Sequence, residues 1–97
     1  MVKKGLLATV VAKEGKEKDV EQFLASAVDL AKKEEKTIHW FAFKIDERTF
    51  GIFDTFNTEE GREAHLSGEI ASQLMANAKE LLNAEPNIQK IDILAAK

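Results

Sequence analysis

The 97-residue chain contains no cysteine, a single proline and no apolar run near the length of a membrane span. Without cysteine there is no disulfide, thiol nucleophile or cysteine-based zinc site, although this absence alone does not fix the compartment. A membrane-spanning helix needs roughly 20 consecutive apolar residues, and no segment offers them. The residues that follow Met1 have too short an apolar stretch, and no convincing cleavage site, for a signal peptide. We therefore expect a cytoplasmic protein without a membrane partner.

A strong charge of either sign is also missing. The chain has 14 Lys and Arg against 17 Asp and Glu, a formal net charge of −3, and its lysines alternate with acids instead of forming a stripe. This argues against a nucleic-acid partner. Motifs for phosphate binding, a serine nucleophile elbow or a zinc-binding helix are absent too. The 44% hydrophobic content and the length are typical of one globular domain, which would span residues 1–97.

The hydrophobic pattern predicts the order strand, helix, strand, strand, helix, strand. Residues 5–12 are a short apolar run rich in β-branched side chains, which predicts a buried strand. From Gly15 to about Glu35, apolar residues recur at spacings of three and four and predict one helix. Residues 37–45 and 49–56 are aromatic and β-branched segments joined by a short polar loop, as in a β-hairpin.

A second helical region follows the hairpin and is expected in two pieces. Thr58 can cap its start, because two glutamates follow in the first turn, where negative charge is favourable. The pair Ser67-Gly68 interrupts the pattern, and Ser67 is a candidate cap for the second piece. We expect Pro86 to stop that helix. The apolar residues of the last strand are Ile88, Ile91, Ile93 and Leu94.

This order is that of an α+β, ferredoxin-like βαββαβ fold with a four-stranded antiparallel sheet. Its strands are apolar on both faces, and the second strand shows this most clearly, with Ile38, Trp40 and Ala42 on one face and Phe41, Phe43 and Ile45 on the other. Two helices cover only one face of such a sheet. A homodimer packed sheet against sheet would cover the second face. Alternatively, one face lines a ligand cavity within the monomer and the other is a thin core.

Four short motifs resemble the antibiotic biosynthesis monooxygenase family, a group of dimeric α+β barrel proteins, over nearly the whole chain. They are the Gly15-Lys16-Glu17 turn, the Trp40 segment, Phe53-Asp54-Thr55-Phe56 and Glu63-Ala64-His65-Leu66. The resemblance implies an oxygenase that oxidises electron-rich phenols or hydroquinones with O2 and needs no metal or flavin. Other branches degrade haem, or bind and isomerise small metabolites. The haem-degrading branch has an asparagine where this chain has Ala8, which argues against haem degradation.

Two residues are candidates for catalysis. His65 can take or give a proton near neutral pH, although a lone histidine is as often satisfied by a backbone group on a helix surface or in a core. Asp54 lies among apolar residues, where an acid must be paired, hydrogen-bonded or shifted in pKa. It either orients His65 or a substrate hydroxyl, or forms a structural pair with Arg62 or Lys44.

Four residues are candidates for substrate binding: Trp40, Phe43, Thr9 and Arg62. Trp40 and Phe43 offer flat surfaces to an aromatic ring, although aromatic residues at strand spacing more often belong to a core. Thr9 either binds a ligand or returns a hydrogen bond to the backbone. Arg62 either holds a carboxylate or phenolate or is solvated. His39 and His65 without a spaced carboxylate make a poor metal site, so we expect neither metal nor cofactor.

The charged run Lys32-Lys33-Glu34-Glu35-Lys36 indicates a helix end and needs no function. Function remains open among three classes. The first is a cofactor-independent monooxygenase that acts on a small aromatic or quinol-like molecule. The others are a non-catalytic dimeric module that binds a small metabolite, and a cofactor-free isomerase or lyase.

Overall fold

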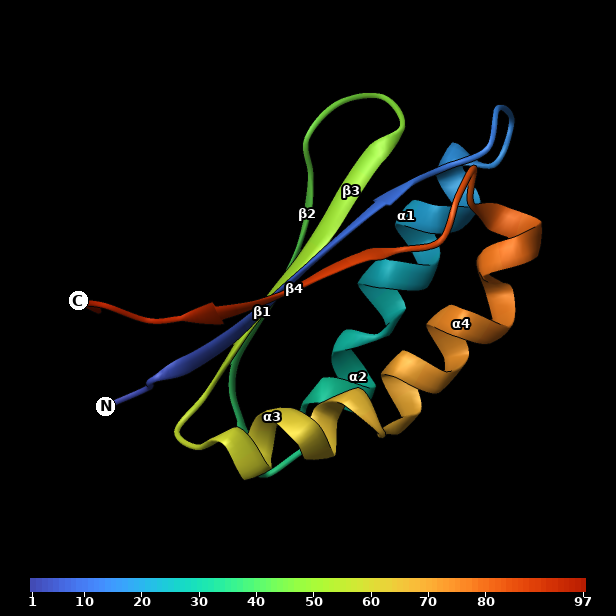
Figure 1. The fold of residues 1–97 in the computed structure, drawn as a ribbon. Helices are drawn as coiled ribbons and strands as arrows, with labels where there is room; N and C mark the ends of the chain where they lie inside the picture. Colours follow the sequence, from blue (N-terminus) through green and yellow to red (C-terminus); the bar gives the residue numbers. More distant parts are fainter.

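The computed structural model describes residues 1–97 as one antiparallel four-stranded sheet with helices on one face (Figure 1). The α+β order expected from the pattern is confirmed. No helix is long and apolar enough to cross a membrane. In chain order the elements are β1 (Lys4–Val11), α1 (Glu17–Ser26), α2 (Val28–Ala31), β2 (Thr37–Lys44), β3 (Thr49–Phe56), α3 (Glu59–Leu66), α4 (Glu69–Leu81) and β4 (Asn87–Asp92).

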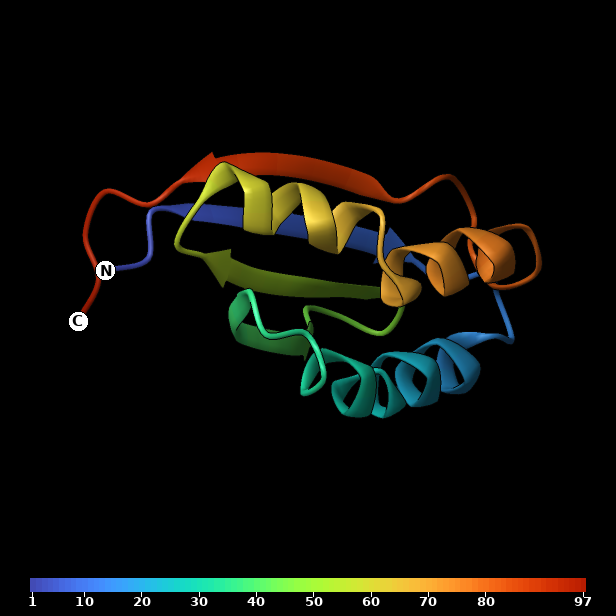
Figure 2. The same cartoon turned by 90° about the horizontal axis from the view of Figure 1, so that it is seen from below.

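The strands lie in the order β2-β3-β1-β4, so β1 is central and pairs with both β3 and β4. Opposite residues of an antiparallel pair share a face. Leu6 of β1 and Trp40 of β2 both pair with Asp54 of β3, which places these three side chains on one face. That face lies under the helices, with α1 and α2 running beside α3 and α4 (Figure 2).

The core fills the space between this face and the helices. Trp40 packs against a larger cluster and also against a smaller one made by Ala27, Ala31 and Ile70. Burying a large apolar side chain contributes roughly 1.5–3 kcal/mol, so the larger cluster dominates the stability of the fold. Its buried members are Val10, Ala12, Val20, Leu24, Phe50, Ile52, Leu74, Ala78 and Leu82.

The helix predicted over 15–35 is shorter and divided. The helix α1 ends at Ser26, and the N–H of Ala27 donates to the carbonyls of both Phe23 and Leu24, a tightened turn from which α2 continues. The helical segment then ends at Ala31 with Lys32 as its C-cap, so the charged run does begin at a helix end, and the residues after it form turns. Glu34 therefore lies in the connection to β2, beside α3.

The capping predictions have mixed outcomes. Thr58 caps α3 as expected, since its hydroxyl oxygen accepts a hydrogen bond from the N–H of Gly61 at 3.1 Å. The prediction that Ser67 caps α4 is wrong. Gly68 occupies that position, and the Ser67 hydroxyl donates instead to the carbonyls of Glu63 and Ala64 at the end of α3.

The predictions for the end of the chain also need correction. The helix α4 ends at Leu81, and Leu82 already forms a bridge with Ala12, so Pro86 does not stop the helix. The last strand β4 ends at Asp92, before Leu94. The N–H of Ile93 still donates to the carbonyl of Lys3 at 2.9 Å.

The face of the sheet without helices is called here the outer face. It carries Phe41, Phe43 and Phe53, and Phe41 is 56% exposed. Ile38, predicted to share a face with Trp40, lies at a register shift between Thr37 and His39, where the ladder is irregular, and has no paired residue on β3. The helices therefore cover the face of β2 that carries Trp40. The sequence could not decide this, because both faces of the strand are apolar.

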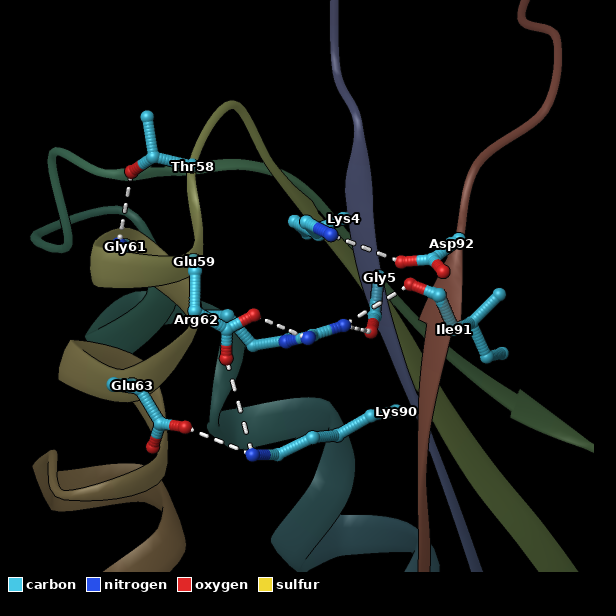
Figure 3. Close-up of polar contacts among 10 residues, drawn as sticks. All are labelled: Lys4, Gly5, Thr58, Glu59, Gly61, Arg62, Glu63, Lys90, Ile91 and Asp92. Atoms are coloured by element: carbon cyan, nitrogen blue, oxygen red, sulfur yellow. Dashed lines mark hydrogen bonds and ion pairs between the residues drawn. The ribbon is translucent and has the colours of Figure 1, made fainter.

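A polar cluster fastens α3 to the sheet (Figure 3). Nη1 of Arg62 donates to the carbonyls of Gly5 on β1 and Ile91 on β4, at 3.2 and 3.1 Å. Its Nη2 is ion-paired with Glu59. These bonds join one buried side chain to two neighbouring strands, so they fix α3 against the sheet and thereby place the next turn of that helix.

Candidate functional site

His65 and Asp54 form a buried ion pair between α3 and the sheet. His65 follows Arg62 by three residues, so it lies on the side of α3 that faces the sheet. Its Nε2 lies 2.9 Å from Oδ2 of Asp54. The two residues are only 8% and 1% exposed. A buried charge needs a partner, and each supplies it to the other.

The expected pairing of Asp54 with Arg62 or Lys44 is wrong. Arg62 is occupied by Glu59 and by the backbone carbonyls, and Lys44 lies 3.7 Å from Glu21. The Nε of Arg62 is buried and has no hydrogen-bond partner. Arg62 is therefore not solvated, as one of the two expectations had it. Arg62 therefore holds α3 against the sheet and takes no part in the ion pair of Asp54 and His65.

A second carboxylate, which the sequence pattern did not single out, contacts the other ring nitrogen. Oε1 of Glu34 lies 2.7 Å from Nδ1 of His65, in hydrogen-bonding geometry. The hydroxyl of Thr37 donates to the same Oε1 at 2.8 Å. The imidazole thus lies between two carboxylates. Glu34 is 31 residues from His65 and belongs to a run of ordinary surface charges, so no local signal marks it.

The two carboxylates change the charge state of His65. Burial of the ring opposes protonation, but the adjacent carboxylate of Asp54, together with that of Glu34, outweighs it and raises the pKa of His65 to about 9. At neutral pH the side chain is therefore an imidazolium with a proton on both nitrogens. It has no lone pair with which to act as a base.

The buried carboxylate oxygens of Asp54 can still accept hydrogen bonds. The 2.9 Å contact of Asp54 with His65 is an ion pair by distance, and neither carboxylate oxygen has a partner in hydrogen-bond geometry. The indole Nε1 of Trp40 is likewise buried without a partner. Trp40 pairs directly with Asp54 in the sheet register, so an unpartnered donor and unpartnered acceptors belong to neighbouring side chains.

A small apolar cavity adjoins the ion pair. Its volume is about 30 Å³, enough for one water-sized molecule but too small for an aromatic ring. Besides Asp54 and His65 its walls are apolar, and Ile88 of the edge strand β4 is 42% exposed at one side. The other walls are Leu6, Ala8, Ile52, Leu66, Ile70, Ala71 and Leu74.

A wider surface groove lies on the opposite side of His65. It measures about 390 Å³ and runs between the α2–β2 connection and α3, with Glu34 and His65 in its lining. His65 therefore separates the groove from the inner cavity. The two carboxylates sit on opposite ring nitrogens, and no group of three or more His, Cys, Asp or Glu side chains is placed to hold one metal ion.

The remaining candidates do not join His65. Thr9 pairs with Gly51, so its side chain lies on the outer face. Phe43 is also there, with its ring so close over Gly51 that a Cβ at that position would lie 2.4 Å from Cζ. His39, on the same face, contacts the hydroxyl of Thr55 at 2.8 Å. The structure thus brings together His65, Asp54 and Trp40, and separates Thr9, Phe43 and Arg62 from them.

Solved structures show which proteins share this chain's sequence and fold. A protein of unknown function from Nitrosomonas europaea is 52% identical, with a TM-score of 0.98, and the match covers 100% of this chain and 94% of that one. The chain belongs to the same family as this Nitrosomonas protein. No protein-family model and no curated protein matches the chain.

More distant solved structures share the fold of this family. A Pseudomonas aeruginosa protein is 20% identical with a TM-score of 0.83, over 98% of this chain and 97% of that one. A Deinococcus radiodurans protein, provisionally named an antibiotic biosynthesis monooxygenase, is 14% identical with a TM-score of 0.84, over 97% and 95% of the two chains. At these identities the likeness establishes the ferredoxin-like fold and not the reaction.

Proposed function

We propose that residues 1–97 act as a single antibiotic biosynthesis monooxygenase-like domain that oxidises a small phenol or hydroquinone with O2, without metal or organic cofactor. The observation that carries this proposal is the buried pair of Asp54 and His65 beside an apolar cavity. A buried carboxylate with unused acceptor capacity next to a fixed positive charge suits the removal of a proton from a hydroxyl group. The provisional name of the Deinococcus relative supports the same class of reaction.

The charge state assigns the roles within the pair. Because His65 is protonated at neutral pH, Asp54 is the group that accepts the phenolic proton. The imidazolium of His65 stabilises the phenolate as it forms, since a fixed charge in a dry site acts strongly. Trp40 does not line the cavity in its closed form, so its unpartnered Nε1 would donate to a phenolic oxygen only after the cavity has enlarged toward β2. The sequence alone predicts that His65 takes or gives the proton while Asp54 orients it, so this assignment exchanges the two roles.

The reaction needs no other reductant. A hydroquinone and O2 give a hydroxyquinone and water, so that one oxygen atom enters the product and the other leaves as water with the two hydrogens that the substrate loses. The substrate supplies all four electrons. The protein's part is to exclude water, to orient the phenolate toward O2 and to hold the protons during transfer.

An aromatic ring needs more space than the inner cavity of about 30 Å³ provides. The proposal therefore requires the wall at Ile88 to open, at the exposed side of β4. Trp40 is the sole tryptophan of the chain and packs in the core beside the site, so its fluorescence reports such a change. A quinol that binds should shift or quench that emission in a saturable way.

The decisive experiment measures oxygen uptake and product labelling from 18O2 with a panel of hydroquinones. We expect one labelled oxygen in the product. Asp54→Asn should lower kcat by about 10²–10⁴-fold, the usual contribution of a general base, while His39→Gln, a matched histidine change on the outer face, should keep the activity. Uptake no faster than the uncatalysed oxidation across the panel would contradict the proposal.

A second function is favoured by the groove beside Glu34. Its volume of about 390 Å³ lies within the usual range of small-molecule sites, whereas the inner cavity does not. A non-catalytic module would bind a metabolite there without turnover. Ligand-dependent thermal stabilisation without any product, detected by mass spectrometry, would identify this function instead of the oxygenase.

We also propose that the outer face pairs with a second copy of the chain. The helices cover the other face only (Figure 2), and Phe41, Val11 and Ile45 of the uncovered side are exposed. Large apolar side chains exposed on one side of a sheet are typical of an interface. A twofold axis would bring the same patch of both copies together.

A further inference from the structure

We propose that Glu34 is a positioning residue for His65: it keeps the Nδ1 proton in place, so that the proton on Nε2 is the one exchanged with Asp54 and the inner cavity. This inference rests on the proposed function, because it refines how the acid–base pair works. It assigns a role to a residue whose sequence context suggested none.

The geometry of the two ring nitrogens distinguishes their protons. The contact from Nδ1 to Glu34 is a short hydrogen bond of 2.7 Å. The contact from Nε2 to Asp54 is an ion pair at 2.9 Å that leaves both oxygens of Asp54 without a hydrogen bond. The better hydrogen bond retains its proton. When the imidazolium loses one proton, the Nε2 position therefore becomes the lone pair.

Glu34 is itself held from two sides. The hydroxyl of Thr37 donates to the oxygen that contacts His65, at 2.8 Å. On the other side lies Gly68, the residue before α4, where a Cβ would come within 3.3 Å of Oε2 of Glu34. The absence of a side chain at Gly68 therefore lets the carboxylate approach. Its rotamer is restricted by contacts from β2 and from the start of α4.

Other charged groups around the ring do not make this contact. Lys33, Glu35, Lys36 and Glu69 line the same groove, and Lys36 is ion-paired with Glu60. On the inner side, Asp54 is the only titratable side chain besides His65 among the cavity walls. The ring is thus bounded by one carboxylate toward the groove and one toward the cavity.

The consequence for chemistry is a fixed direction of proton transfer. The Nε2–H bond breaks as its proton moves to the oxygen atom of O2 that leaves as water, and the neutral ring keeps its Nδ1–H on Glu34. The proton that Asp54 took from the substrate then moves to Nε2 and restores the imidazolium. No proton is lost or gained in this cycle. If the Nδ1 proton were not held, the neutral ring could carry its one proton on Nε2 instead. Nε2 would then have no lone pair with which to accept the proton from Asp54.

Nitrogen-15 NMR of the histidine rings tests the inference without any substrate. The spectrum shows which nitrogen keeps its proton above the pKa of about 9. The variant His39→Gln assigns the signals, because the chain has two histidines. We expect the wild-type ring to become the Nδ1–H tautomer. Glu34→Gln should convert the neutral ring to Nε2–H and lower the pKa of His65 by about one unit or more.

Two further variants keep the test interpretable. Glu35→Gln removes the same charge from the neighbouring exposed residue and should leave the tautomer unchanged. Thr37→Val is a mild change that removes the hydroxyl bond to Glu34 and should raise the Nε2–H share in part. An Nε2–H tautomer in the wild-type protein, or an unchanged tautomer in Glu34→Gln, would overturn the inference.

The two proposals fail separately. If Glu34 controls the tautomer but no hydroquinone is oxidised, the positioning role stands and the oxygenase proposal falls. If hydroquinones are oxidised but the tautomer does not depend on Glu34, the reverse holds. In an active protein, Glu34→Gln should lower kcat with little effect on KM and move the pH profile, because Glu34 acts through His65 and not on substrate.

Discussion

The two faces of the sheet differ in what they do with apolar side chains. Under the helices, apolar residues enclose a charged pair whose members are almost completely buried. On the outer face, aromatic residues such as Phe41 are exposed, and the polar contact of His39 with Thr55 is a hydrogen bond to a hydroxyl group and not an ion pair. We therefore place the proposed chemistry, which depends on low dielectric, on the covered face and the proposed association on the outer one.

Neighbouring residues of one strand show how this division arises. Along β3, Phe50, Ile52 and Asp54 point toward the helices, while Phe53 and Thr55 point away. The period of two alone separates a catalytic candidate from an interface candidate. A change at adjacent positions of this strand should therefore have effects of different kinds.

The largest effect on folding is expected for Phe50→Ala. Phe50 is 2% exposed in the larger core cluster, and its truncation should cost about 3–5 kcal/mol of unfolding free energy. Phe41→Ala on the outer face should cost the isolated chain less than about 1 kcal/mol. Urea unfolding at low protein concentration measures both. Equal losses would show that the outer face is also a core of the monomer, and would break the comparison.

Association should be most sensitive to Phe41→Asp. A charge at this position of the outer face would be buried without a partner in a sheet-to-sheet dimer, at a cost of about 3–5 kcal/mol. We expect sedimentation velocity to show a dimer for the wild-type chain and a monomer for the variant. Glu47→Asp, in the hairpin loop, is a control that keeps the charge. A stable wild-type monomer at micromolar concentration would exclude this use of the outer face.

Much of the fold could be predicted because its signals are local. The strand at 49–56 has the bounds that its aromatic and β-branched residues predicted. The cap at Thr58 and the break at Ser67-Gly68 follow from side chains within a few residues of the affected backbone. The choice between the two faces of β2 could not be predicted, because both are apolar and only the packing of distant helices distinguishes them.

The site could be predicted only in part, for the same reason. Asp54 and His65 were recognisable because an acid among apolar residues and a histidine are unusual in their surroundings. Glu34 was missed because a glutamate between lysines has no distinguishing neighbours, and its contact depends on the turn after Ala31. Arg62 was misassigned because its acceptors are backbone carbonyls of two strands far away in the sequence.

The covered face should also make stability depend on pH. The pKa of His65 rises from its ordinary 6.5 to about 9 on folding, so between these values the folded chain binds more protons than the unfolded chain. The stabilisation is complete below pH 6.5 and is lost as the pH rises through 9. The loss is up to about 3 kcal/mol. Urea unfolding at several pH values should show this slope, and His65→Gln should flatten it. A wild-type stability that increases over this interval would contradict the pairing.

A smaller effect is expected where α3 is fastened to the covered face. Arg62→Lys keeps the positive charge, but one ammonium on a shorter side chain cannot replace both Nη1 on the two carbonyls and Nη2 on Glu59, so the acceptors of Gly5 or Ile91 lose their partner. Leaving such a buried acceptor unsatisfied costs about 1–3 kcal/mol. Because α3 also carries His65, we expect the pKa of His65 to fall together with the unfolding free energy of the protein. Lys90→Arg, in the exposed ion pair with Glu63 on the same helix, is the control and should change neither quantity. A destabilised Arg62→Lys protein with an unchanged His65 pKa would show that α3 does not need this fastening to place the site.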